Sequence, residues 1–296
     1  MSSRSKPSYT VHAGFRMPMG FPVEGFRSAL DYPAGPGDVF ISTYPKCGTT
    51  WMQNIVWLIL QRGEALAAAD RMAEVIPHLE EVGRARVEQL PEPRVVKTHL
   101  PFEMSPYHSE ALYLYVARNP FDCAVSFYHH TKGFVQHYDF AEGSFDDYFE
   151  CFIRGEVDFG DYFENVLSWF RHRRDSNFLF VTYEEMKADL ERVVARVAAF
   201  LGPEHAATVA DPSVVRRILE FAGFESMSRD QTRWASDRPD GMSPFVRKGV
   251  VGDWVNHFSP LQVRRMLERI EAQPGATELV ELWPDVMTEA RSFAEG

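Results

Sequence analysis

Residues 39–51 read VFISTYPKCGTTW, and this stretch decides the fold class of the 296-residue chain. Its first five residues are mostly β-branched or aromatic, which predicts a buried strand. The glycine-containing loop that follows leads straight into residues 51–61, where apolar residues recur at helical spacing. A strand that passes directly into a helix is the repeating unit of a parallel sheet.

The same alternation continues along the chain and predicts an α/β fold, with a central parallel β-sheet flanked by helices on both faces. Further strands are expected at residues 95–99, 112–117 and 178–182, and further helices at 121–130, 161–172 and 184–201. No repeat or long linker interrupts the pattern, so we expect a single domain over residues 1–296. Ligands of such sheets bind beyond the carboxyl ends of the strands, where candidate functional residues are therefore sought.

The composition restricts the possible functions. The chain has 31 Lys and Arg against 42 Asp and Glu, a formal charge of −11 with His neutral, which argues against a nucleic-acid partner but permits a small basic pocket. Its three scattered cysteines predict neither a disulfide framework nor a zinc site. The longest apolar run, residues 55–60, is too short for a membrane span, so we expect a cytoplasmic protein without a membrane partner.

The loop YPKCGTTW (44–51) has the features of an anion-binding site. Gly48 permits close approach of the backbone, Thr49 and Thr50 add hydroxyl donors at a helix start, and Lys46 adds charge. The loop is not a Walker loop, because G-x-x-x-x-G-K-[ST] is absent and the lysine precedes the glycine. The alternative interpretation is a tight strand-to-helix turn with a threonine cap.

A second basic residue follows another predicted strand, in VARNPFDCAVS (116–126). Arg118 lies at the strand end, and the Asn-Pro pair after it predicts a capped helix start. Ser126 lies about two turns further on and reaches the same anion only if the helix runs past the site. The alternatives are a structural salt bridge for Arg118 and an ordinary helix serine for Ser126.

A third basic segment is RKGVVGDW (247–254). Arg247, Lys248 and Gly249 can offer two charges and a backbone amide to one phosphate. The alternative is a solvated pair of charges in a loop.

His99 is the candidate general base, because it ends an apolar strand with Lys97 two residues earlier on the same face. A nearby cation lowers the pKa of a histidine and keeps it able to accept a proton. The alternative is a hydrogen-bonded histidine at a strand end. No histidine spacing supports a metal site, and we assign none.

Taken in order, YPKCGTTW, KTHLP, VARNP…S and RKGxxGDW resemble the motifs of the cytosolic sulfotransferases. The resemblance spans residues 44–254 and implies an α/β fold similar to that of the P-loop kinases. It also implies the sulfuryl donor 3′-phosphoadenosine 5′-phosphosulfate (PAPS), the product PAP and no required metal.

The resemblance gives individual residues their roles. It makes His99 the catalytic base, Lys46 the cation that offsets charge on the leaving nucleotide, and Lys97 a supporting lysine. Trp51 and Tyr183 match adenine contacts, Arg118 and Ser126 match the 3′-phosphate site, and the phosphate loop matches the 5′-phosphosulfate site. The complete implied donor site is Lys46, Cys47, Gly48, Thr49, Thr50, Trp51, Arg118, Ser126, Tyr183, Phe224, Met227, Phe245, Arg247, Lys248 and Gly249.

Two departures from the family pattern matter. Cys47 stands where many relatives have serine, and it is either a reactive thiol or a small neutral substitute for serine. Residues 255–264, VNHFSPLQVR, lack the Lys, Val and Glu of the usual C-terminal dimerisation segment. We therefore expect a monomer, or a homodimer that does not use this segment.

The acceptor is the least determined part of the prediction. We expect His78, Glu80, Phe127 and His130 to line its pocket, together with an irregular N-terminal segment over residues 1–35. Glu80 and Glu81 favour an amine, so a phenolic or catechol amine such as dopamine or octopamine is the first candidate. A simple phenol, a steroid or an alcohol is the alternative, and a P-loop nucleotide kinase or an inactive nucleotide-binding module is a remote one.

Overall fold

Four parallel strands form the central sheet of the structure, a computed structural model that describes residues 6–12, 14–229, 231–234 and 247–296. The strands are β3 (Asp38–Thr43), β4 (Arg94–Thr98), β5 (Leu112–Ala117) and β6 (Phe178–Thr182), in the spatial order β4-β3-β5-β6. Every neighbouring pair is parallel. The α/β fold is therefore confirmed, and each predicted strand agrees with the structure to within one residue at either end.

Helices cover the sheet, and a short antiparallel hairpin of β1 (Tyr9–His12) and β2 (Phe15–Pro18) precedes it. The α-helices are α1 (Val23–Leu30), α2 (Thr49–Leu60), α3 (Met72–Val75), α4 (Leu79–Val87), α5 (Pro120–Gly133), α6 (Val135–Tyr138), α7 (Phe145–Phe152), α8 (Tyr162–Phe170), α9 (Tyr183–Ala188), α10 (Leu190–Leu201), α11 (Pro203–Val209), α12 (Pro212–Ala222), α13 (Phe224–Arg229), α14 (Pro260–Glu271), α15 (Ala276–Leu282) and α16 (Pro284–Glu295). The 3₁₀ turns are η1 (Phe102–Met104), η2 (Gln231–Arg233) and η3 (Asp253–Asn256).

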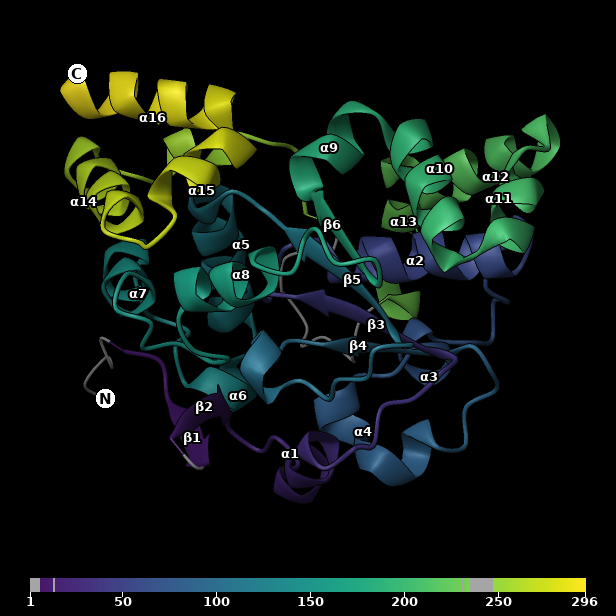
Figure 1. Cartoon of the computed structure of the whole chain (residues 1–296). Helices are drawn as coiled ribbons and strands as arrows, with labels where there is room; N and C mark the ends of the chain where they lie inside the picture. Colours follow the sequence, from purple (N-terminus) through teal and green to yellow (C-terminus); the bar gives the residue numbers. More distant parts are fainter. Residues whose placement is uncertain (1–5, 13, 230, 235–246) are drawn as a thin grey trace.

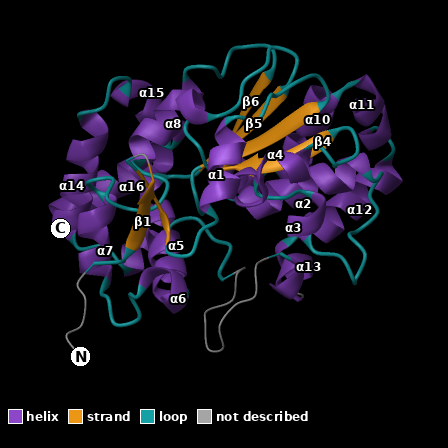
Figure 2. Ribbon diagram, turned by 90° about the horizontal axis from the view of Figure 1, so that it is seen from below, coloured by secondary structure: helices purple, strands orange, loops and turns teal. Residues whose placement is uncertain are grey.

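Alternate residues of each strand enter two separate hydrophobic cores. Phe40 and Tyr113 pack on one face of the sheet, in a core shared with α5, α7, α8, α14 and α16. Ile41 and Leu114 pack on the other face, in a core shared with α2, α10 and α12. Figures 1 and 2 show α14 to α16 grouped with α5 and α7 on one side of the molecule, and α10 to α12 grouped with α2 on the other. This two-sided burial is the reason why the strands are continuously apolar.

Two predicted segments differ from the structure. Residues 184–201 were expected to form one helix but form α9 and α10, because Asp189 leaves the helical conformation and its side chain caps α10 at the amide of Arg192. Residues 1–35 were expected to be irregular, but their described part forms β1, β2 and α1. The hairpin and α1 place buried Met17 and Phe26 in a third core beside Phe159, which the sequence pattern does not indicate.

Among the described residues, no helix combines the length and the apolar character that crossing a membrane would require.

Candidate active site

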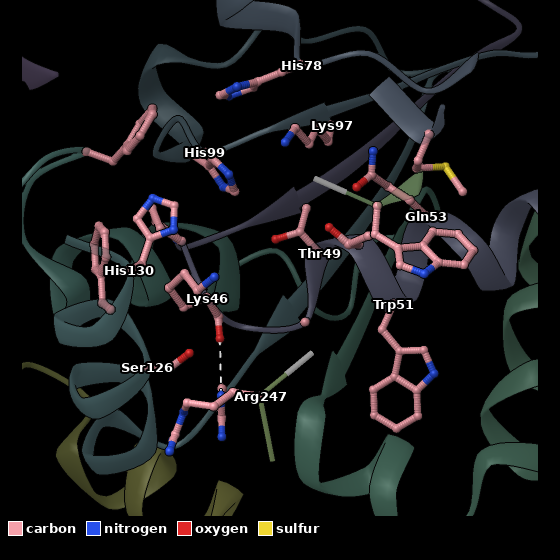
Figure 3. Close-up of a pocket in the computed structure, with 18 of the residues that line it drawn as sticks. Lys46, Thr49, Trp51, Gln53, His78, Lys97, His99, Ser126, His130 and Arg247 are labelled. Atoms are coloured by element: carbon pink, nitrogen blue, oxygen red, sulfur yellow. Dashed lines mark hydrogen bonds between the residues drawn. The ribbon is translucent and has the colours of Figure 1, made fainter. Parts of the chain in front are cut away.

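A cavity of about 380 Å³ opens at the carboxyl edge of the sheet. The residues that follow the four strands all reach it: Lys46 after β3, His99 after β4, Arg118 after β5 and Tyr183 after β6. Figure 3 shows His78, His99 and Lys97 towards one end of the cavity, and Arg247 and Trp51 towards the other, with Lys46 between them. The structure therefore brings together groups that are up to 200 residues apart in the sequence.

Most of the predicted site residues line this cavity. Those on its wall are Lys46, Gly48, Thr49, Thr50, Trp51, His78, Lys97, His99, Arg118, Ser126, Phe127, His130, Tyr183, Phe224, Met227, Arg247, Lys248 and Gly249. Cys47 and Glu80 are not on the wall, and Phe245 lies outside the described residues.

The loop before α2 has the backbone of an anion cradle. Lys46 has φ +70° and Gly48 has φ +102°, so two nearby residues adopt left-handed conformations. A Cβ at Gly48 would lie 3.0 Å from Cδ2 of the Tyr183 ring, so a side chain there would have to push the ring aside. Lys46 is a non-glycine residue in a rarely used conformation, and such strain is concentrated at functional sites.

The first turn of α2 has no side-chain cap. Its N-cap residue is Gly48, and no side chain of the described residues caps this helix start. The hydroxyl of Thr49 instead lies 2.6 Å from that of Thr43 in β3. The alternative of a threonine-capped turn is therefore wrong, and the first turn of α2 lies beside the cavity that Thr49 and Thr50 line, where amides at a helix start can bind an anion.

Cys47 does not face the cavity. Its side chain is fully buried beneath the loop, with Sγ 3.7 Å from Sγ of Cys123 in α5. Its amide donates to the carbonyl of Tyr44. The placement of Cys47 among donor-site residues is therefore corrected: it is a small buried residue between two elements, because the left-handed conformations of Lys46 and Gly48 turn it inwards.

Arg118 is buried on the wall of the cavity, whose end at Arg247 and Trp51 is called the donor end because the predicted donor-site residues lie there. Its guanidinium donates to the carbonyls of Lys46 and Val250 and stacks over the Tyr183 ring, with Cζ 4.4 Å from the ring centroid. Its Nε has no hydrogen-bond partner among the described residues. A buried N–H without a partner is costly, so it indicates a missing acceptor such as a phosphate oxygen.

Helix α5 carries Ser126 to the same end. The predicted start is confirmed, since Asn119 accepts from the amide of Asp122 and Pro120 occupies the first turn. Because α5 continues to Gly133, it runs past the site and places Ser126 on the cavity wall with Arg118.

Arg247 and Lys248 share a carboxylate that the sequence did not single out. Arg247 lies 2.7 Å and Lys248 2.6 Å from the two oxygens of Asp253. Burial alone would raise the pKa of Asp253, but hydrogen bonds from Lys248 and Arg247 outweigh it and lower the pKa well below its usual range. Asp253 thus pairs with both cations, although the side chain of Lys248 is still 48% exposed, and both remain on the cavity wall.

Aromatic and apolar side chains cover the remaining wall of the donor end. The rings of Trp51 and Tyr183 meet edge to face at 5.4 Å, and the indole of Trp51 donates to the carbonyl of Ala222. Phe224 and Met227 complete this wall with Trp234, which sequence reasoning missed. The combination of an aromatic slot and a cationic end suits a phosphorylated nucleotide.

The ring of His99 has a defined tautomer. Its Nδ1 lies 2.9 Å from the carbonyl of Thr43, which only accepts hydrogen bonds, so Nδ1 carries the proton and Nε2 the lone pair. Asn165 donates to the carbonyl of His99, and the amide of His99 donates to Glu80. Burial, with positive charge at His78 and Lys97, lowers the pKa of His99 to about 3. His99 is therefore neutral and positioned to accept a proton.

Glu80 faces away from the cavity, which corrects its predicted place in the acceptor pocket. Its side chain is fully buried, and Oε1 accepts from the amide of His99 at 2.7 Å. The same oxygen lies 3.4 Å from Nε2 of His78, whereas Glu81 lies 3.4 Å from Nδ1 and lines the cavity. Glu80 turns inwards because the amide of His99, beyond the end of β4, needs an acceptor.

The acceptor end contains residues that no motif marked. Phe21 from the N-terminal segment and Phe159 from the loop between α7 and α8 lie beside His78, and Phe159 also lies beside His99. Phe159 has φ +61°, unusual for a bulky residue, and this turn presents its ring to the histidines. Asp158 precedes it, is almost completely buried and accepts from the hydroxyl of Tyr138 at 2.8 Å. Burial raises the pKa of Asp158 to about 7.

The sulfotransferase domain family matches residues 36–281 of this chain. The chain belongs to the sulfotransferase family. It is 34% identical to rat sulfotransferase 1C2 over 275 residues, which cover 87% of this chain and 90% of the rat protein. It is 33% identical to human sulfotransferase 1E1 over 243 residues, which cover 77% and 80% of the two chains. A crystal structure of a mouse sulfotransferase complexed with PAP superposes with a TM-score of 0.72 at 26% identity, covering 97% of this chain and 99% of the mouse chain.

Sequence signals for the missed residues of this sulfotransferase differ in kind. Asp253 lies within the RKGVVGDW segment, five residues after Lys248, so its short distance in the sequence already indicates a possible acidic partner for the two cations. Phe21 lies in the N-terminal segment that was expected to line the pocket, but no pattern singled it out. Tyr138, Asp158 and Phe159 lie in loops and short elements without a periodic pattern, and only the fold places them together. No group of three or more metal-ligating side chains occurs within the described ranges.

Proposed function

We propose that this sulfotransferase moves the sulfuryl group of PAPS to the hydroxyl of a small aromatic acceptor, with His99 as the base. PAPS supplies an activated sulfuryl group on a good leaving group. The unpartnered Nε of Arg118 and the tight glycine positions at the cavity wall support binding of its phosphates. The mouse sulfotransferase that this chain resembles was crystallised with PAP, which also supports this donor.

The tautomer of His99 is the observation that carries the proposal. With Nδ1–H donating to Thr43, Nε2 takes the proton from the acceptor hydroxyl as its oxygen forms a bond to sulfur. Lys46 and Lys97 line the same space and offset the negative charge that develops on the transferred group and on the leaving oxygen. Sulfuryl transfer then depends on in-line positioning and on charge stabilisation by these side chains.

The acceptor that we propose is a small phenol or catechol. The aromatic rings of Phe21, Phe127 and Phe159 on the cavity wall favour a flat apolar body over an extended polar chain. Amine-bearing members such as dopamine or octopamine remain within this class, because Glu81 lines the cavity and its side chain is 43% exposed. A cytoplasmic location, and a monomer or a dimer that does not use residues 255–264, stay predictions.

The substitution His99→Ala tests the base. A positioned base contributes roughly 10²- to 10⁴-fold, so kcat should fall by about that factor while the affinity for PAP stays within about threefold. Turnover is followed with a panel of phenols, catecholamines, steroids and alcohols, and PAP binding is followed by calorimetry with and without magnesium.

His172→Ala is the matched control, because His172 pairs with Asp175 and does not line the cavity. Normal turnover by His99→Ala would exclude the proposed base. Binding of PAP only in the presence of magnesium would instead favour the nucleotide-kinase alternative.

A further inference from the structure

One histidine of the acceptor end lies between two carboxylates. Nε2 of His78 is 3.4 Å from Oε1 of Glu80, and Nδ1 is 3.4 Å from Oε2 of Glu81. An ionised carboxylate can only accept hydrogen bonds, so a neutral imidazole would turn one of its lone pairs towards an anion. Nε2 makes no hydrogen bond within the described residues, so its contact with Glu80 is electrostatic, and both contacts are favourable when both ring nitrogens carry hydrogen. The geometry therefore favours an imidazolium at His78.

The surroundings hold this charge in place. Glu80 is fully buried and its Oε1 is already committed to the amide of His99, so it cannot turn towards water. A buried carboxylate needs a partner of opposite charge, and His78 supplies it. Burial alone would lower the pKa of His78, and Lys97 lowers it further, but attraction to Glu80 and the close contacts with both carboxylates outweigh these effects and raise the pKa. The pKa of Glu80 is lowered in turn, because the charge of His78 outweighs its own burial.

His78 lies next to the reacting groups. It lines the cavity, and its ring centroid is 5.0 Å from that of His99. Figure 3 shows His78 and Lys97 on the same side of His99, with His130 on the other. Four charged side chains thus surround the neutral base: His78 and Lys97 are positive, and Glu80 and Glu81 are negative.

We propose that His78 is a fixed positive charge in the acceptor wall, and that it selects phenols, whose oxygen readily carries negative charge, over aliphatic alcohols. The inference rests on the function proposed above. With His78 charged, three cations (His78, Lys97 and Lys46) outnumber the two carboxylates, so negative charge can build on the acceptor oxygen as His99 removes its proton. Without the charge of His78, two carboxylates would face two lysines, and a negative oxygen would be less stabilised. His78 acts through this field and not by taking the proton.

The ionisation of bound 4-nitrophenol tests this charge directly, because the phenolate absorbs visible light and the phenol does not. The wild-type chain and His78→Phe are each saturated with PAP and 4-nitrophenol, and the absorbance is titrated against pH. His78→Phe keeps an aromatic ring and removes the charge. We expect the pKa of the bound phenol to rise by about one unit or more, a tenfold or greater loss of ionisation. The preference for phenols over aliphatic alcohols in kcat/KM should fall by a similar factor.

His130→Phe is the matched control, since it makes the same substitution on the same cavity wall without removing a partner of Glu80 or Glu81. It should leave the pKa of bound 4-nitrophenol within about 0.3 unit, a shift of twofold or less. An equal shift in both variants would assign the effect to packing and overturn the inference.

Removing His78 leaves Glu80 without its partner and can prevent folding, so a second measurement uses the wild-type chain. Nitrogen-15 chemical shifts at pH 8, assigned through contacts of His78 with Phe21 and Phe159, should show both ring nitrogens protonated. A neutral His78, or an unchanged 4-nitrophenol pKa in a folded His78→Phe, would overturn the inference alone. Failure of the wild-type chain to bind 4-nitrophenol would overturn the proposed function together with it.

Discussion

Gly249 offers a sharp test of the donor site. It lies on the cavity wall with φ +62°, and an added Cβ would lie 2.4 Å from Cδ2 and 2.6 Å from Cε2 of Phe224. Real Cβ atoms do not approach this closely, so Gly249→Ala must displace the ring. Phe224 is 40% exposed and can swing towards solvent, which would spare the core but remove the ring from the donor wall.

The expected loss follows from these contacts. Loss of an aromatic contact costs about 0.5–1.5 kcal/mol, and loss of an amide hydrogen bond to a charged phosphate about 1.5–3 kcal/mol. Displacing Phe224 and part of the Gly249 amide contact should therefore weaken PAP binding by ~2 kcal/mol, roughly 30-fold. Calorimetric titration with PAP measures this loss.

Gly252→Ala is the matched control in the same loop. Gly252 also has a positive φ, of +90°, but a Cβ there would meet no described atom within 4 Å. An alanine in this conformation adds backbone strain of about 1–2 kcal/mol in both variants, with and without ligand. The strain should therefore lower the stability of both variants, but by itself it should not change their affinity for PAP. The clash is specific to Gly249. In a Phe224→Ala background, Gly249→Ala should lose most of its additional effect on PAP affinity. Equal PAP affinities for Gly249→Ala and Gly252→Ala would refute the reasoning.

Two further predictions concern positions beneath the acceptor end. Asn165→Leu removes the hydrogen bond that orients the carbonyl of His99, so kcat should fall about tenfold while the affinity for PAP is retained. The control is Tyr115→Phe, which removes only the hydrogen bond from Tyr115 to Asn165. Equal effects of the two substitutions on kcat would contradict the positioning role of Asn165. Burial raises the pKa of Asp158 from 3.8 to about 7, so the stability that its protonated form provides is present below pH 3.8 and is lost progressively as the pH rises to about 7. Asp158→Asn should have the same melting temperature as the wild type near pH 4 and a higher one at pH 8. The gain in the free energy of unfolding at pH 8 should be at most ~4 kcal/mol. A difference between the two proteins that does not change with pH would argue against a buried titrating carboxyl.

Much of the fold could be predicted because its signals are local. Each strand of the sheet is a short run of β-branched and aromatic residues, and the alternation with helices specifies parallel pairing. The break at Asp189 was missed because its cap competes with a helical pattern that continues on either side. The N-terminal hairpin was missed because its stability comes from packing on the loop that contains Phe159.

Most residues of the proposed donor site line one cavity, as the sequence predicted, since glycine, hydroxyl and basic residues at strand ends meet at one edge of the sheet. The same reasoning placed Cys47 and Glu80 wrongly, because it identifies positions and not the directions of side chains. Cys47 turns inwards where the loop adopts left-handed conformations, and Glu80 turns inwards to meet the amide of His99. Neither direction is written in a local pattern.

The sequence alone therefore determined the parallel α/β sheet, and it predicted the cationic loop before α2 and the candidate base His99, because each depends on residue types within a short window. Only the tertiary structure decided which charges oppose one another: Asp253 against Arg247 and Lys248, and His78 between Glu80 and Glu81. Coulomb energies depend on distance and on burial, and both are properties of the packed chain. The −11 charge of the whole molecule thus says little about this site, whose chemistry depends on a few charges held at fixed positions around one neutral histidine.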